Sequence, residues 1–177
     1  IQYLGHVITR EGFHPNKKYV DKVVRMAVPT NRKAVARYLG MVNWLTKFIP
    51  NLAQAVAPIN RLKVKDVKFV WSAECAESFD IIQELVSNAK LLHHPDFKKQ
   101  FFLQTDASND CIGAMLFQYR DPQTKEEVLP IEFMSKTLSG NELNWHSNEK
   151  ECFAVLCAVR KWYKFLCAAP FVVLTDH

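Results

Sequence analysis

The sequence predicts an α/β chain (α+β overall), in which a short hairpin and several helices precede a mixed β-sheet. Two observations support this. Apolar residues recur at helical spacing before Pro95, and after it they gather in short β-prone runs. The runs of the second half follow the order strand, strand, strand, helix, strand. A helical crossover after three successive strands places the fourth strand parallel to an earlier one, in a mixed sheet.

The composition is that of an ordinary soluble globular protein, with 49% apolar and 23% charged residues. It excludes a disordered or collagen-like chain, and no apolar run approaches the roughly 18 residues of a membrane span. We therefore expect no membrane partner. The opening residues Ile1–His6 do not resemble a signal peptide and lack an initiator Met, so we expect a fragment of a longer protein.

Five cysteines, an odd number without a C-x-x-C pair, predict a reducing compartment rather than a disulfide scaffold. Cys152 and Cys157 fall in an apolar helical pattern, and we expect both to be buried.

Charge divides the chain into two parts. Residues 1–70 carry 13 Lys and Arg against three Asp and Glu, a balance of +10. Residues 71–177 carry 10 against 15, a balance of −5. The asymmetry suggests a basic module that binds a polyanion and an acidic module with another task. Solvated surface charge alone is the alternative interpretation.

The first elements are a hairpin and a helix. Residues 1–14 predict the hairpin, with Gly12 in its turn, where a positive φ favours glycine. Apolar residues at positions i, i+3, i+4 and i+7 predict a helix over 16–27, and Pro29 stops it.

Three further helices follow. A helix from Thr30–Asn31 to about Phe48 ends at Pro50–Asn51, and a shorter piece covers 52–62. A charged connector over 63–68 leads to another helix. Ser72 caps this helix, which ends by about Lys90.

The second half predicts strands over 100–105, 111–118 and 128–135, a helix over about 147–166 and a last strand over 171–175.

Three carboxylates mark the candidate site. Asp106 lies at the end of the first of these strands, and Asp176 ends the fourth. If the two strands are parallel neighbours, both acids emerge at one sheet edge, roughly 5 Å apart. Glu151, in the first turns of the crossover helix, can reach the same point. A hard divalent cation such as Mg²⁺ or Mn²⁺ relieves the repulsion between them, and two such ions can activate water on a phosphodiester.

Each acid also has a purely structural interpretation. Asp106 can cap a turn, Glu149 and Glu151 can favour a helix start, and Asp176 can simply end a strand.

Other candidate sites are weaker. His93–His94 would point to opposite faces of a strand, which disfavours zinc. Ser108 and His146 lack the Gly-rich turn of a nucleophile pair. Three aromatic side chains could stack bases, although core packing explains their spacing as well: Trp44, Phe48 and Trp71.

At these acids the sequence resembles the RNase H region of gypsy-type LTR retrotransposon and retroviral polymerases. The motifs are Thr105-Asp106-Ala107-Ser108 with Ile112–Leu116, Glu149-Lys150-Glu151 with Ala154-Val155, and Thr175-Asp176-His177. The upstream part resembles their reverse transcriptases, so the whole likeness covers nearly all of the chain. Tyr3-Leu4-Gly5-His6 resembles the primer grip, and residues 29–31, 38–40, 43–44 and 48–51 resemble the thumb. Trp71, Cys75, Phe79 and Pro95-Asp96 resemble the segment that joins thumb to RNase H.

The resemblance implies three segments: a primer-grip-like hairpin (1–14), a helical thumb with its connection (15–92) and a partial RNase H-like domain (93–177), a C-terminally truncated β-β-β-α-β sheet. It assigns catalysis and metal binding to Asp106, Glu151 and Asp176. Glu151 is preferred to Glu149 because it directly precedes Cys152-Phe153-Ala154, which matches a family helix segment. A fourth acid is expected beyond His177, and the Y-x-D-D polymerase motif upstream of Ile1.

The implied activity of the parent is hydrolysis of the RNA strand of RNA·DNA hybrids by two Mg²⁺ (or Mn²⁺) ions, together with copying of RNA into DNA. The implied partners are the hybrid, the template-primer duplex and the other Pol domains, namely fingers and palm upstream and the rest of RNase H and integrase downstream. The resemblance implies a cytoplasmic virus-like particle and allows a nuclear phase. The residues expected to grip the duplex backbone are Lys18, Lys22, Arg25, Arg32, Lys33 and Arg37.

Two outcomes stay open at this point. We expect negligible nuclease activity from the isolated fragment, which holds three of the four acids. The alternative function is an inactive, domesticated remnant that only binds nucleic acid through its basic half.

Overall fold

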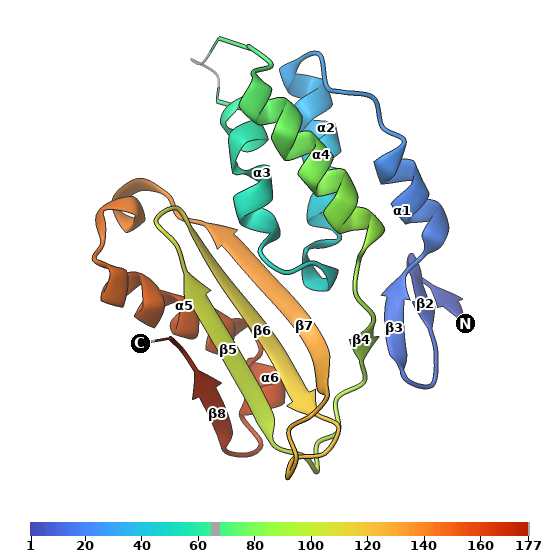
Figure 1. Ribbon diagram of the computed structural model, residues 1–177, viewed down its shortest axis with the longest axis vertical. Coiled ribbons are helices and arrows are strands. Elements are labelled where there is room, and N and C mark those ends of the chain that lie inside the picture. The colour runs from blue at the N-terminus through green and yellow to red at the C-terminus, as the bar shows by residue number, and fades with distance from the viewer. Residues whose placement is uncertain (65–67, 177) are drawn as a thin grey trace.

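The computed structural model describes residues 1–64 and 68–176. Helices α1–α4 and a small sheet form one part of the molecule, and a larger sheet with α5 and α6 forms the other (Figure 1). The mixed helix-and-strand fold that the sequence predicted is confirmed. Part of the connector predicted over 63–68 lies outside the described residues.

The small sheet is more elaborate than the predicted hairpin. Its antiparallel order is β1-β2-β3-β4, and β4 comes from the distant end of the helical part. A tight turn at Leu4 and Gly5, with φ of 45° and 80°, joins the first two strands, as in type I′ hairpins. The sequence did not predict β4, because a strand of two residues carries no periodic pattern. The strands are β1 (Gln2–Tyr3), β2 (His6–Ile8), β3 (Gly12–Pro15) and β4 (Leu92–His93).

The helices begin where the capping residues predict. Asn31 accepts a hydrogen bond from the Ala34 amide, and Ser72 accepts one from the Cys75 amide. The helix ends were predicted too late: the chain leaves the helix well before Pro29 and again after Asn43, where a 3₁₀ turn follows. The elements are α1 (Lys17–Val24), α2 (Arg32–Asn43), η1 (Thr46–Phe48), α3 (Leu52–Arg61) and α4 (Ala73–Ser87).

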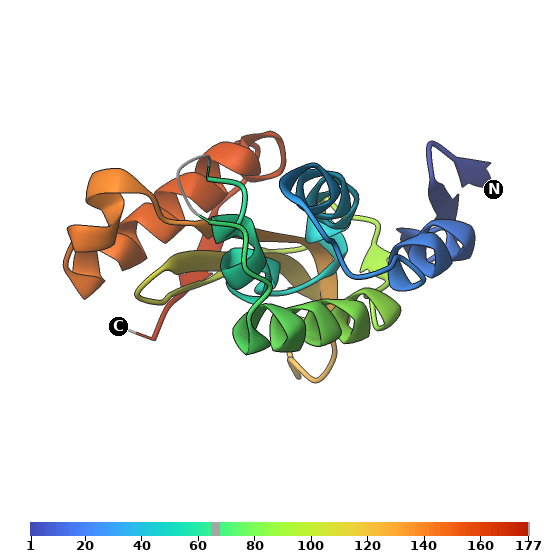
Figure 2. The same ribbon diagram turned by 90° about the horizontal axis from the view of Figure 1, so that it is seen from above.

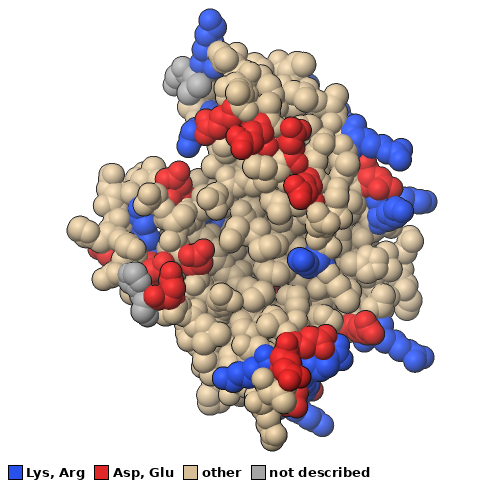
Figure 3. Space-filling model, in the orientation of Figure 1, with Lys and Arg blue, Asp and Glu red and all other residues tan. Residues whose placement is uncertain are grey.

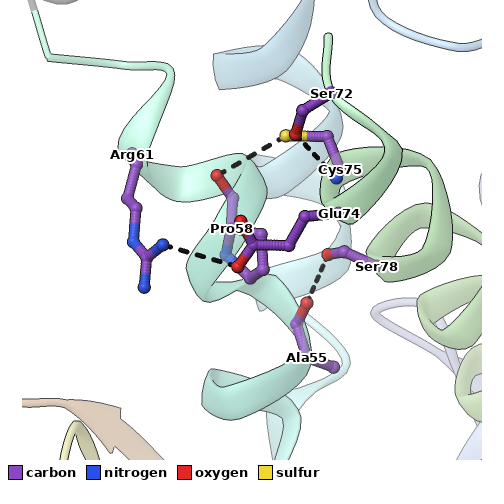
Figure 4. A network of polar contacts seen from close by, with 7 residues as sticks. All are labelled: Ala55, Pro58, Arg61, Ser72, Glu74, Cys75 and Ser78. Atoms are coloured by element: carbon purple, nitrogen blue, oxygen red, sulfur yellow. Dashed lines mark hydrogen bonds and ion pairs between the residues drawn. The ribbon is translucent and has the colours of Figure 1, made fainter.

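Helices α3 and α4 are joined by polar contacts as well as by their apolar core (Figure 4). Ser78 Oγ donates to the Ala55 carbonyl, and Cys75 Sγ lies 3.8 Å from the Pro58 carbonyl oxygen. Both acceptors are carbonyls of α3. Pro58 lies in the last turn of this helix, which ends at Arg61, and carbonyls there lack partners within the helix. Helix α4 therefore fixes the orientation of α3.

The large sheet has the predicted mixed topology. Its order is β7-β6-β5-β8, antiparallel throughout except for the parallel pair β5 and β8. The connection from β7 to β8 contains η2 (Gly140–Asn144), α5 (Ser147–Lys161) and α6 (Tyr163–Leu166). The strands are β5 (Phe101–Ala107), β6 (Cys111–Tyr119), β7 (Val128–Thr137) and β8 (Phe171–Leu174).

Different elements cover the two faces of this sheet. Ala154 and Ala158 of α5, together with Trp162 directly after it, pack against Leu103 and Leu116 on one face (Figure 2). On the other face, η1 and α3 contact β7, and Phe133 is buried in the core of the helical part. The two parts of the molecule thus share one packed interface.

The burial of α5 corrects one expectation about the cysteines. Cys152 is exposed and Cys157 only partly buried, because α5 turns Lys150, Glu151, Ala154 and Ala158 inward. None of the helices in the described part of the chain is long and apolar enough to cross a membrane.

The small sheet is held against the helices by an aromatic cluster. The His6 ring stacks on Trp44 with centroids 4.7 Å apart, and Lys47 Nζ lies 2.9 Å from His6 Nε2. Burial, and then the charge of Lys47, lower the pKa of His6. The neutral imidazole accepts from Lys47, so protonation removes this contact.

Gly12 is needed for a different reason from the one that the sequence predicted. It begins β3 and does not have a positive φ, so the expected turn position is wrong. A Cβ at Gly12 would lie 1.9 Å from the Leu92 carbonyl oxygen of β4. Close approach of the β4 backbone therefore explains the glycine.

We expect Gly12→Ala to lower the free energy of unfolding by about 2 kcal/mol, because overpacking against β4 strains the fold. A Cβ at Gly40 in α2 would meet nothing within 4 Å. Gly40→Ala should therefore raise the free energy of unfolding by about 1 kcal/mol. Urea denaturation of both variants checks this, and equal effects at the two glycines would contradict the packing of β4.

We expect acid to weaken the fold through His6. Its folded pKa is lowered, so the unfolded state takes up a proton first as the pH falls, and the stability present above pH 6.5 is lost below it. His6→Gln should flatten the fall in melting temperature between pH 7 and pH 5. The exposed His146→Asn serves as the control and should keep the slope; an unchanged slope in His6→Gln would refute the assignment.

Candidate metal centre

The pairing of β5 with β8 brings two of the predicted acids together. Phe101 lies beside Phe171 and Gln104 beside Leu174, in one constant register. The same register, continued past the end of β8, places Asp106 beside Asp176. Asp106, Glu151 and Asp176 each offer one carboxylate oxygen to a common point, and these three oxygens lie within 4.8 Å of one another. The three acids that the sequence singled out therefore meet at one point.

Glu151 reaches the cluster from the first turns of α5. Its side chain is buried, and Oε1 accepts a hydrogen bond of 3.1 Å from the Ala107 amide, at the end of β5. This bond holds the carboxylate beside the strand that carries Asp106. Glu149 has a different task, because its carboxylate accepts from the His146 amide at 2.9 Å and caps the helix. The geometry thus separates the two glutamates that the sequence pattern left close together.

Lys150 is a residue of this region that the sequence analysis missed. Its side chain is buried, and Nζ donates to the carbonyls of Asn109 and Leu143 at 2.9 and 3.0 Å. It therefore joins the turn between β5 and β6 to η2, next to the start of α5. A lysine in a Glu-Lys-Glu run is typical of a solvated charge, so the sequence held no signal for this role.

The cluster has the donor set that a hard cation requires. Three carboxylates offer only oxygen ligands, and Asp106 and Asp176 are exposed, so a cation and its water ligands can reach them. Like charges this close repel one another, and a divalent cation would turn that repulsion into attraction. The residues present fit Mg²⁺ or Mn²⁺.

The six basic residues predicted to bind nucleic acid lie elsewhere. Lys18 and Lys22 are on α1, Arg25 directly follows it, and Arg32, Lys33 and Arg37 are on α2. All are exposed except Arg32, which is partly buried. Figure 1 shows α1 and α2 on the opposite side of the molecule from β8, so the structure does not bring them to the acids.

Charge on the face seen in Figure 3 is also divided. Acidic side chains gather over α4, where Glu74, Glu77, Asp80 and Glu84 are exposed, and basic side chains lie toward the edge near α1. Like-charge repulsion therefore disfavours a polyanion over α4.

The residues predicted as a primer grip form the first tight turn. Tyr3 and Leu4 are exposed on 62% and 74% of their surface, whereas Gly5 lies against Trp44. His6 belongs to the aromatic cluster. The turn thus presents two apolar side chains to solvent from a rigid base.

The weaker candidates gain no support. Among residues 1–64 and 68–176, the only group of three potential metal ligands is the acid cluster, and it does not include His93 or His94. Ser108 Oγ bonds the Cys111 carbonyl within its own turn. Phe48 is fully buried, and Trp44 and Trp71 pack partly buried against the same core.

Known proteins resemble this chain in sequence and in fold. The profile of the family described as "RNase H-like domain found in reverse transcriptase" matches residues 71–173. The transposon Tf2-3 and Tf2-4 polyproteins of Schizosaccharomyces pombe are each 34% identical over 179 residues, which include all of this chain. The chain spans 13% of the length of these curated relatives.

Solved structures show the same fold. The foamy viral protease-reverse transcriptase in complex with RNA/DNA hybrid has a TM-score of 0.83 and 21% identity, and the match covers 100% of this chain and 24% of the viral one. The same viral protein in complex with dsDNA has a TM-score of 0.82, and the match covers 36% of it. The match of the profile to more than half of the chain, together with these polyproteins, confirms the resemblance to retrotransposon and retroviral polymerases: the chain belongs to the family of RNase H-like domains found in reverse transcriptases.

Proposed function

We propose that this chain contributes a ribonuclease H centre to a retrotransposon reverse transcriptase. Asp106, Glu151 and Asp176 hold two divalent ions there, and the parent polyprotein cuts the RNA strand of RNA·DNA hybrids and copies RNA into DNA. The observation that carries this proposal is the convergence of the three carboxylates within 4.8 Å. Repulsion between the carboxylates costs stability, and a bound cation would remove that cost.

The three acids divide the work. Glu151 is buried and fixed by the Ala107 amide, so it can hold an ion in one position. Asp106 and Asp176 are exposed at the end of the sheet, where a phosphodiester can approach. A bound pair of Mg²⁺ ions would supply an activated water and stabilise the leaving oxygen.

The basic helices α1 and α2 supply the duplex grip in this proposal, and the Tyr3–His6 turn supplies the primer grip. Two supports are the net positive charge of the N-terminal part and the nucleic acids in the foamy viral complexes. Because α1 and α2 lie far from the acids, the same hybrid would span both parts of the molecule. The remaining Pol domains are the other proposed partners, within a virus-like particle.

We expect Mg²⁺ to stabilise the chain through the acid cluster. At about 100 times its Kd, the ion should raise the free energy of unfolding by about 2.7 kcal/mol. Asp106→Asn should abolish this gain and, without metal, should stabilise the chain because one repelling charge is removed. Thermal unfolding with and without MgCl₂ measures both effects.

Asp110→Asn is the matched control, since Asp110 is exposed, close to Asp106 in the sequence, and lies outside the cluster. It should keep the full metal response. If the unaltered chain shows no response to millimolar Mg²⁺, the metal centre is wrong and the binding-only remnant is favoured.

We expect binding of an RNA·DNA hybrid to weaken steeply with salt. Replacing Lys18, Lys22 and Arg25 by Gln should lower the affinity at low salt and reduce the slope of log K against log salt by up to about 3, because fewer counterions are released. Fluorescence anisotropy over a series of KCl concentrations gives both quantities.

The control removes three exposed lysines from the other part of the molecule, Lys98, Lys125 and Lys164. These substitutions change net charge equally but should leave most of the slope intact. Equal losses in both triple variants would show that α1 is not the duplex grip.

A further inference from the structure

A polar corner of the helical part lies over the large sheet beside the acid cluster. Asn51, which precedes α3, sits above Gly113 of β6, so that a Cβ built on Gly113 would lie 2.5 Å from Asn51 Oδ1. Gly113 is the cross-strand partner of Asp106. Asn51 is therefore about one strand spacing, roughly 5 Å, from the position of Asp106 in the sheet. Hollows of about 20 and 200 Å³ beside Asp106 are both lined by Asn51.

The backbone turns the Asn51 side chain away from its own helix. Asn is among the best helix N-caps, but that role needs an extended backbone. Asn51 instead has φ 51° and ψ 26°, in the left-handed region, and its side chain makes no capping bond. The helix is capped from outside, because the Ala53 amide donates to Ser135 Oγ of β7 at 3.0 Å.

This external cap leaves the Asn51 amide available. Within the described residues its side chain has no hydrogen-bond partner, and it is exposed. Gln54 is also exposed, lies one helical turn further on the same side of α3 and lines the smaller hollow with Asp106. Two neutral amides thus face the space beside a carboxylate cluster.

We propose that Asn51, assisted by Gln54, binds the sugar–phosphate backbone of the hybrid strand that lies over Asp106. The proposal rests on the ribonuclease H function proposed above and adds a substrate contact from the helical part. A neutral amide suits this position because it can donate to a phosphate oxygen without pairing with the acids. A lysine would pair with the carboxylates and compete with the metal, and an acid would repel the phosphate.

The central experiment compares Asn51→Gly with the unaltered chain. Glycine adopts the left-handed backbone readily, so this variant removes the amide while it keeps the corner. Hybrid affinity is measured by anisotropy in Ca²⁺, whose longer ligand distances than those of Mg²⁺ disfavour the in-line reaction. We expect about tenfold weaker binding for Asn51→Gly, the usual cost of losing a hydrogen bond to a charged group. Gln54→Ala should weaken binding less.

Two further substitutions separate the amide from the fold and from the metal. Asn51→Asp keeps the shape but adds a negative charge, so it should bind the hybrid more weakly than Asn51→Gly. Ser135→Ala removes the external cap, and it should lower the melting temperature while hybrid affinity, measured well below that temperature, stays within about twofold, since the Asn51 amide remains. Asn51→Gly should keep both the melting temperature and the Mg²⁺ response of the unaltered chain.

Repeating the titration with a DNA duplex identifies the contacted group. An equal loss on both duplexes indicates a phosphate contact, and a loss confined to the hybrid indicates a 2′-hydroxyl. Hybrid binding by Asn51→Gly within twofold of the unaltered chain overturns this inference and leaves the metal centre intact. A lost Mg²⁺ response in Asn51→Gly, or tighter binding by Asn51→Asp, would make Asn51 part of the metal site and also overturns it. Absence of hybrid binding by the unaltered chain overturns both the contact and the proposed function.

Discussion

The parallel pairing of β5 with β8 is the constraint on which the site depends. A fixed register between two strands that are distant in the sequence sets Asp106 and Asp176 side by side, and the crossover helix between them delivers Glu151 to the same end of the sheet. Slipping the register by one residue would turn Asp176 to the other face. The sheet face that packs against α5 opposes such a slip, because Leu103 is buried there in one apolar core with Ala154 and Trp162. Packing of the core therefore determines the geometry of the acids.

The second constraint is the docking of the helical part on the opposite face. Phe133 of β7 is buried among the helices, and Ser135, further along the same strand, caps α3. Because Ser135 of the sheet accepts a hydrogen bond from the first turn of α3, Asn51 at the N-cap position of that helix can face the acid cluster. The two parts of the chain thus form one surface next to the acids, and the helical part can influence a centre to which it supplies no carboxylate.

The sequence predicted those features that depend on local patterns. The β-β-β-α-β order, the caps at Asn31 and Ser72 and the convergence of three acids follow from periodicity and from the right-handed crossover. Features made by distant contacts were not predictable: the pairing of Leu92 with Phe13, the external cap by Ser135 and the buried Lys150. Their partners lie far away in the sequence in most cases, and each residue type is ordinary at its position. The division of tasks between Glu149 and Glu151 also became visible only in the geometry.

Locating a bound ion tests the central claim most directly. Crystals of the chain grown with Mn²⁺ would show the ion through its anomalous scattering, independently of any activity. The account predicts anomalous density between the carboxylates of Asp106, Glu151 and Asp176, with each ion in direct contact with carboxylate oxygens. Ordered carboxylates without density between them, at a Mn²⁺ concentration that fills sites elsewhere on the surface, would contradict the metal centre.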